Sequence, residues 1–295
     1  MRQTDIYKPK RVPRRVRHDI RGVGYSVLEW GPAESPPIVW LHGWGDCAAT
    51  AQFVVDALDS GRRVVAPDFR GFGESRAEVA SYWFPDYLAD LDALLSIFSP
   101  DAPVTLIGHS MGANVAGLYA GTMPERVNAF VNIEGFGLAN ADPETAPERY
   151  REWIEAGRAT PAFSEYADFT ALARRLAKRS PAMGDDRAEF VARAWAVEEE
   201  GRVRLRADPR HRLPNPVLYR RAESEACWRR VSAPVLLVSG GNSPFARGDD
   251  VRLDASPMPF PDAEAVTIPD VGHMLHFEAA EDVAAHIEAF LQARL

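Results

Sequence analysis

The sequence predicts an α/β protein built on a mostly parallel sheet with helices on both faces. Two observations support this fold class. Short apolar runs that end in turn residues recur through the first half of the chain, and each is typical of a buried strand. Helical patterns separate these runs, and such alternation favours a parallel sheet covered on both sides. The runs are Pro37–Leu41, Arg63–Pro67, Pro103–Ile107 and Val127–Ile133.

The remaining elements follow from the same patterns. Residues 15–20 and 25–30 alternate polar and apolar side chains, which predicts an antiparallel hairpin at the sheet edge. Residues 234–238 and 265–268 resume the strand pattern late in the chain, so eight strands are expected in all. The predicted helices of the sheet layers are 48–58, 87–98, 111–120 and a terminal helix at 278–295.

Residues 137–231 break this alternation. Their apolar side chains recur at helical spacing with few strand signals, as in the set Phe169, Leu172 and Leu176. We therefore expect a core formed by residues 1–136 and 232–295, with a helical segment of residues 137–231 inserted after the sixth strand. Aromatic residues of this segment can line an apolar pocket or hold the segment together: Trp153, Phe163, Tyr166, Phe169, Trp195 and Tyr219.

Composition limits the classes of partner. The 295 residues are 46% hydrophobic and 26% charged, as expected for a globular chain with a sizeable core. The net charge of −8 argues against a polyanionic partner such as nucleic acid, and the basic N-terminal arm lacks the interleaved aromatic residues of a nucleic-acid surface. No apolar run is long enough for a membrane span or a secretory signal.

The cysteine pattern points to a compartment. Cys47 and Cys227 lie far apart, and neither belongs to a C-x-x-C pair. This usage fits a reducing environment better than a disulfide framework, so we expect a cytoplasmic protein.

A nucleophile motif lies between a predicted strand and a predicted helix. Residues 108–112 read Gly-His-Ser-Met-Gly, which matches the elbow pattern G-x-S-x-G. Such a turn holds its serine at strained backbone angles, and only small neighbours leave room for it. Gly108 and Gly112 supply that room, which indicates Ser110 as a nucleophile.

Three further motifs make the chain resemble the α/β-hydrolase superfamily, in its capped serine-hydrolase branch. They are Leu41-His42-Gly43-Trp44-Gly45, the segment from Pro67 to Ser75, and Gly272-His273. The resemblance covers nearly the whole chain and implies an eight-stranded α/β-hydrolase fold with the inserted segment as a cap. It also implies an oxyanion hole formed by the backbone N–H groups of Trp44 and Met111.

The expected general base is His273. It follows the last strand through a short loop and precedes the terminal helix, where the chain order of nucleophile, acid and histidine requires a base. His42 and His109 lie inside the motifs and are interpreted as structural. We take His276 and His286 to be helix-face residues.

The acid of the predicted triad departs from the pattern of the family. Most members carry an aspartate after the seventh strand, but Asn242 occupies that place here. Glu134 ends the sixth strand, and some haloalkane dehalogenases are known to hold their acid there. We therefore predict Glu134 as the acid, with Asp249 and Asp250 as rivals.

Neither a cofactor nor a metal is expected. Gly71-Phe72-Gly73 begins like a dinucleotide loop, but Arg76 occupies the third glycine position. The sequence also lacks an H-E-x-x-H motif and zinc-type cysteine spacing.

The sequence favours a serine hydrolase that cleaves a carboxylic ester of a small molecule, with an apolar acyl or aryl group, through an acyl-enzyme on Ser110. Thioesterase, lactonase or carbon–carbon bond hydrolase activity with the same residues stays open. Haloalkane dehalogenases and epoxide hydrolases carry an aspartate at the place of Ser110, so the serine argues against these two activities. A non-catalytic receptor on the same fold is the alternative from another class. The natural substrate and the oligomeric state stay open.

Overall fold

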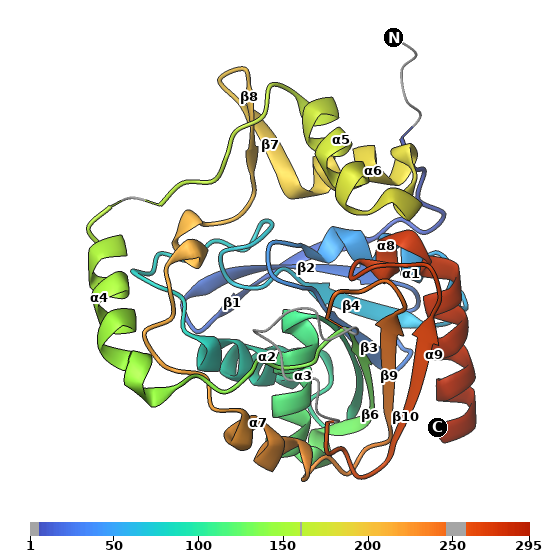
Figure 1. The fold of residues 1–295 in the computed structure, drawn as a ribbon. Helices are drawn as coiled ribbons and strands as arrows, with labels where there is room; N and C mark the ends of the chain where they lie inside the picture. Colours follow the sequence, from blue (N-terminus) through green and yellow to red (C-terminus); the bar gives the residue numbers. More distant parts are fainter. Residues whose placement is uncertain (1–5, 160, 246–257) are drawn as a thin grey trace.

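A computed structural model describes residues 6–159, 161–245 and 258–295. Its main sheet has eight strands in the order β1-β2-β4-β3-β5-β6-β9-β10 (Figure 1). β2 runs antiparallel to both of its neighbours and the other pairs are parallel, which confirms the predicted fold class. The strands are β1 (Arg14–Ile20), β2 (Val23–Trp30), β3 (Pro37–Leu41), β4 (Arg63–Pro67), β5 (Val104–His109), β6 (Val127–Ile133), β9 (Val235–Gly240) and β10 (Ala263–Ile268).

Helices cover both faces of this sheet (Figure 1). Leu91 of α2, Tyr119 of α3 and Trp228 of α7 share one apolar core, whereas Val54 of α1 and Ile287 of α9 belong to the core on the other face. These helices are α1 (Gln52–Val55), α2 (Phe84–Phe98), α3 (Met111–Thr122), α7 (Arg221–Trp228), α8 (Leu275–Glu278) and α9 (Ala280–Arg294). The predicted terminal helix, 278–295, corresponds to α9. The short helix α8 precedes it and is separated from it at Ala279, which lies outside the helical region at φ −138° and ψ 50°.

The segment between β6 and β9 contains more than helices. It includes α4 (Ala146–Ala156), α5 (Phe169–Arg179) and α6 (Asp185–Trp195), and then a hairpin of β7 (Ala196–Glu199) and β8 (Arg202–Leu205). Glu200 and Gly201, at φ 52° and 73°, form the two-residue turn of this hairpin. Such turns favour asparagine, aspartate or glycine at the first position. Because a glutamate occupies this position, the sequence carries no clear turn signal for the hairpin.

The last helix of the same segment packs with the sheet. Trp228 of α7 is buried together with Phe130 of β6 and Tyr119 of α3. In Figure 1, α5, α6 and the β7–β8 hairpin lie instead beyond one edge of the main sheet. Within the described residues, no helix is both long and apolar enough to cross a membrane.

Candidate active site

The backbone at Ser110 has the strained geometry of a nucleophile elbow. Ser110 joins β5 to α3 at φ 52° and ψ −113°, a region that residues with a side chain rarely adopt. A side chain at Gly112 would place its Cβ 2.1 Å from the Leu41 carbonyl oxygen, and one at Gly108 would meet the backbone of Ala113 at 2.5 Å. The two glycines are therefore required by the close approach of the elbow to its neighbours.

The imidazole of His273 pairs with the carboxylate of Glu134. His273 Nδ1 lies 2.9 Å from Glu134 Oε2, and Glu134 is only 3% exposed. The backbone N–H of Gly240 donates to Oε1 over 2.7 Å, and the hydroxyl of Ser243 donates to Oε2. Three donors thus hold this carboxylate in one orientation, and the remaining ring nitrogen of His273, Nε2, is directed away from it.

The sheet register explains why Ser110 and Glu134 lie at the same edge of the sheet. His109 of β5 pairs with Ile133 of β6, so the residues that follow, Ser110 and Glu134, leave the sheet at the same edge. The Ser110 N–H donates to the Ile133 carbonyl over 2.8 Å, and the Glu134 N–H donates to the Val238 carbonyl over 3.0 Å. Glu134 also has a positive φ of 58°, which turns its side chain out of the strand direction.

His109 connects the elbow to the loop that carries His273. Its Nε2 lies 2.9 Å from the backbone carbonyl of His273 and donates a hydrogen to it. Burial lowers the pKa of the His109 imidazole well below its ordinary value, so this ring is neutral near pH 7. His109 therefore fixes the position of the His273 backbone relative to Ser110.

The loop after β3 approaches the elbow from the other side. The N–H of Phe69 donates to His42 Nε2 over 2.8 Å, and His42 Nδ1 lies 2.7 Å from the Gly43 carbonyl, so this ring braces the loop. The next residue, Trp44, is 53% exposed, and its ring packs against Phe163 with centroids 6.3 Å apart. Met111 is the first residue of α3, a position whose N–H has no partner within the helix.

A groove of about 710 Å³ lies between the core loop 71–78 and the inserted segment. Phe163 and Tyr82 line it together with charged side chains of both signs, including Arg206 and Asp208. Ser110 is not among its lining residues. Phe163, which lines the groove, packs against Trp44 of the loop after β3.

Sequence analysis missed the side chains that lie behind the His273–Glu134 pair. His276 of α8 is a helix residue as predicted, but it is fully buried, and its Nε2 lies 3.3 Å from Oδ2 of the buried Asp46. Burial lowers the pKa of His276, whereas at Asp46 the hydrogen bond and charge of His276 outweigh burial and lower the pKa. Ser243 was also missed, because a serine in a loop carries no distinctive spacing. Asp249 and Asp250 lie outside the described residues.

Comparisons with known proteins agree with this architecture. The model of the alpha/beta hydrolase fold family matches residues 36–280. A serine hydrolase-like protein of Danio rerio is 27% identical over 273 residues, which are 89% of this chain and 83% of that protein. The structure of a thioesterase domain from the curacin biosynthetic pathway is similar with a TM-score of 0.84 at 26% identity, over 94% of this chain and 99% of that one. The structure of a hypothetical protein from Pseudomonas aeruginosa PAO1 is similar with a TM-score of 0.80 at 30% identity, over 95% of this chain and 99% of that one. The chain therefore belongs to the α/β-hydrolase family.

Proposed function

We propose that the protein is a serine hydrolase that cleaves a carboxylic ester, or a related acyl bond, through an acyl-enzyme on Ser110. The observation that carries this proposal is the strained Ser110 elbow beside the His273–Glu134 pair. A serine at such a turn, with a histidine oriented by a buried carboxylate, is the arrangement that activates a hydroxyl as a nucleophile.

The reaction proceeds in two halves. Ser110 Oγ attacks the acyl carbon while His273 Nε2 takes the hydroxyl proton, and Glu134 stabilises the imidazolium through Nδ1. The backbone N–H groups of Trp44 and Met111 donate to the oxyanion, and each such donor is worth about 2.7–4 kcal/mol in the transition state. His273 then protonates the leaving group. In the second half it takes a proton from water, whose oxygen attacks the acyl-enzyme, and Ser110 regains its proton when the acid leaves.

The substrate is a small molecule with an acyl group, and esters are the first candidate. Similarity to the curacin thioesterase domain supports thioesters as the second candidate. Lactones and carbon–carbon bonds beside a ketone fit the same chemistry. We assign the part of the substrate remote from the acyl carbon to the side of Trp44 and Phe163, where an exposed aromatic ring adjoins the groove.

The proposal includes a cap and a compartment. We propose residues 137–231 as the cap over the core, in which α5, α6 and the β7–β8 hairpin form the part that lies beyond one edge of the sheet in Figure 1. The free thiols of Cys47 and Cys227 support a cytoplasmic protein, because both remain unpaired in the fold.

A fluorophosphonate label and a panel of chromogenic esters and thioesters test the function together. We expect the label on Ser110 alone, and Ser110→Ala should lower kcat by on the order of 10⁶. Ser96→Ala on the exposed face of α2 is the matched control and should retain wild-type turnover. Label on another residue, or hydrolysis by Ser110→Ala, would contradict the mechanism. Ligand binding by the wild type without labelling or turnover would favour a receptor.

A further inference from the structure

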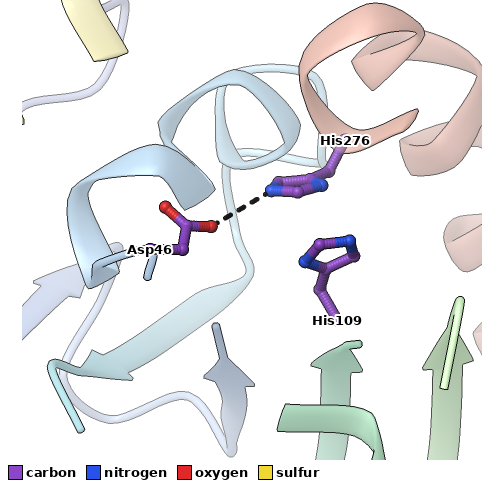
Figure 2. A group of neighbouring side chains, drawn as sticks. All are labelled: Asp46, His109 and His276. Atoms are coloured by element: carbon purple, nitrogen blue, oxygen red, sulfur yellow. Dashed lines mark hydrogen bonds and ion pairs between the residues drawn. The ribbon is translucent and has the colours of Figure 1, made fainter. Parts of the chain in front are cut away.

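Two histidines and one aspartate form a buried cluster behind the candidate catalytic pair. Figure 2 shows Asp46 from the loop after β3, His109 from the end of β5 and His276 from α8 pointing toward a common centre. One donor atom of each lies within 4.8 Å of the donor atoms of the other two, and all three side chains are buried. We propose that Asp46, His109 and His276 bind a divalent transition-metal ion with the ligand preferences of zinc.

The hydrogen bond of His109 leaves one ring nitrogen free for a metal. Its Nε2 donates to the His273 carbonyl over 2.9 Å, so the proton resides on Nε2 and the lone pair on Nδ1. Nδ1 is buried and has no hydrogen-bond partner among the described residues. A backbone carbonyl on the far nitrogen is the usual support of a metal-binding histidine, because it fixes both tautomer and ring orientation.

The carboxylate of Asp46 is likewise held by one oxygen. Its Oδ1 accepts from the N–H of Cys47 over 2.8 Å, the hydroxyl of Thr50 over 2.8 Å and the indole N–H of Trp195 over 2.7 Å. Its Oδ2 faces His276. Three donors on Oδ1 therefore orient the second oxygen toward the cluster, as supporting hydrogen bonds do for metal-binding carboxylates.

The spacing between Asp46 and His276 matches a metal site. Two ligands of a tetrahedral zinc ion lie about 3.3–3.4 Å apart, given metal–ligand bonds of roughly 2.0–2.1 Å. His276 Nε2 and Asp46 Oδ2 are 3.3 Å apart. His276 Nδ1 has no hydrogen-bond partner within the described part of the chain, so it is free to carry the ring proton when Nε2 binds a metal.

Gly43 leaves room beside the third ligand. A Cβ at this position would lie 2.8 Å from His109 Nδ1, so only glycine keeps that side of the ring open. Since the donor atoms lie within 4.8 Å of one another, a bound ion draws the widest pair together by at most about 1.5 Å, within reach of side-chain rotation. Three protein ligands leave a fourth coordination position for a water molecule.

Metal binding at this cluster should inhibit hydrolysis, an effect that rests on the proposed function. His109 directly precedes Ser110 and holds the His273 backbone, and His276 lies three residues after His273. Movement of these two rings toward an ion therefore displaces both candidate catalytic residues. Transfer of the Ser110 hydroxyl proton to His273 depends on the distance between these two side chains. We therefore expect turnover to fall as the metal site fills.

The binding test needs no catalysis. Metal-free protein is titrated with Co²⁺ and then Zn²⁺, and we expect one Co²⁺ per chain with the visible absorption of a tetrahedral site, displaced by Zn²⁺. His276→Asn and Asp46→Asn should each weaken Zn²⁺ binding by more than about tenfold, because loss of a group that only supports a ligand already costs about tenfold or more in metal affinity. His286→Asn, on the half-exposed face of α9, is the matched control and should bind as the wild type does.

Folding of each variant is checked by fluorophosphonate labelling and thermal unfolding, and Gly43→Ala provides a third variant that blocks the site without removing a ligand. The proposal is overturned if the wild type binds no Co²⁺, or if the folded His276→Asn and Gly43→Ala proteins bind it equally well. Binding with unchanged ester turnover would refute inhibition but retain the site. Failure of labelling at Ser110 with intact Co²⁺ binding would instead count against the proposed hydrolase.

Discussion

Two histidine–carboxylate pairs lie close together in this protein, and they differ in exposure and geometry. The His273–Glu134 pair has its short contact of 2.9 Å, and the His273 side chain is 22% exposed. The His276–Asp46 pair has a longer contact of 3.3 Å, and both side chains are at most 1% exposed. The same pairing of an imidazole with a carboxylate is thus suited to different tasks: a ring that must exchange protons with substrate needs access, and a buried ring with a free nitrogen suits a metal ligand.

Neutralising the two carboxylates should separate the pairs most clearly. We expect Glu134→Gln to keep the fold but to lower kcat by on the order of 10³–10⁴, because an amide cannot stabilise the imidazolium of His273. Asp46→Asn should lower kcat by less than about tenfold, since its partner His276 does not touch the reacting atoms. Steady-state hydrolysis of a chromogenic ester measures both.

A Glu134→Gln protein that stays nearly fully active would remove Glu134 from the triad. If Asp249→Asn or Asp250→Asn then abolishes turnover, the acid follows the seventh strand as in most family members. Equal losses for Glu134→Gln and Asp46→Asn would mean that the two pairs act as one unit, and the distinction drawn from exposure would be wrong.

A third histidine isolates the effect of burial. His211 stacks between Phe72 and Tyr82, with ring centroids 3.8 and 3.6 Å away, and its Nε2 lies 3.2 Å from the Arg70 carbonyl. Burial lowers its pKa from 6.5 to about 4, although nearby Asp208 opposes the shift. Below pH 6.5 the unfolded chain binds a proton that the folded protein excludes. The resulting stability is complete above pH 6.5 and is lost progressively toward pH 4.

Urea unfolding at pH 7 and pH 5 measures this contribution. Proton binding by His211 in the unfolded chain should lower the free energy of unfolding by about 2 kcal/mol at pH 5, since each pKa unit is worth about 1.4 kcal/mol. His211→Phe keeps a stacked ring without a titrating group, so its loss between the two pH values should be smaller than that of the wild type by this amount. An unchanged loss would show that His211 is protonated in the folded state.

The pattern of buried strands made the sheet predictable, but not the inserted segment. β3, β4 and β6 carry apolar runs that end in a turn, and their bounds match those predicted. The β7–β8 hairpin lacks such a run because its strands are four residues long and only half-buried. Its turn also begins at a glutamate, so neither signal was available.

The same limit applies to the candidate site. Ser110, Glu134 and His273 each follow a recognisable strand in the sequence, so motif context could propose them as site residues. Asp46, His109 and His276 are 63 and 167 residues apart along the chain, so no spacing rule joins them. They meet because β3 and β5 are neighbours in the sheet and the His276 ring of α8 lies against Trp40 of β3 and His109 of β5, which is a property of the folded chain.

The smallest expected effect concerns the Ser243 hydroxyl, which donates to the same Glu134 oxygen that pairs with His273. Asp46 Oδ2 has His276 as its partner, but Glu134 Oε2 accepts from both His273 and the fully buried Ser243. Ser243 follows Asn242 in the loop where the family acid is expected, so this loop supplies a donor to the carboxylate of Glu134, the residue directly after β6. Loss of a hydrogen bond to a charged group costs about 1.5–3 kcal/mol, part of which is expressed in the transition state.

Ser243→Ala should therefore lower kcat by about tenfold with KM unchanged, because Ser243 orients the acid and does not touch the substrate. Ser239→Ala is the matched control: this hydroxyl of β9 lies just before the same loop and makes an exposed hydrogen bond with Thr267 of β10, so turnover should stay at the wild-type level. A rise in KM at constant kcat would place Ser243 in substrate binding. If both variants lose activity equally, the loop acts through its fold, and the second donor on Oε2 has no part in positioning Glu134.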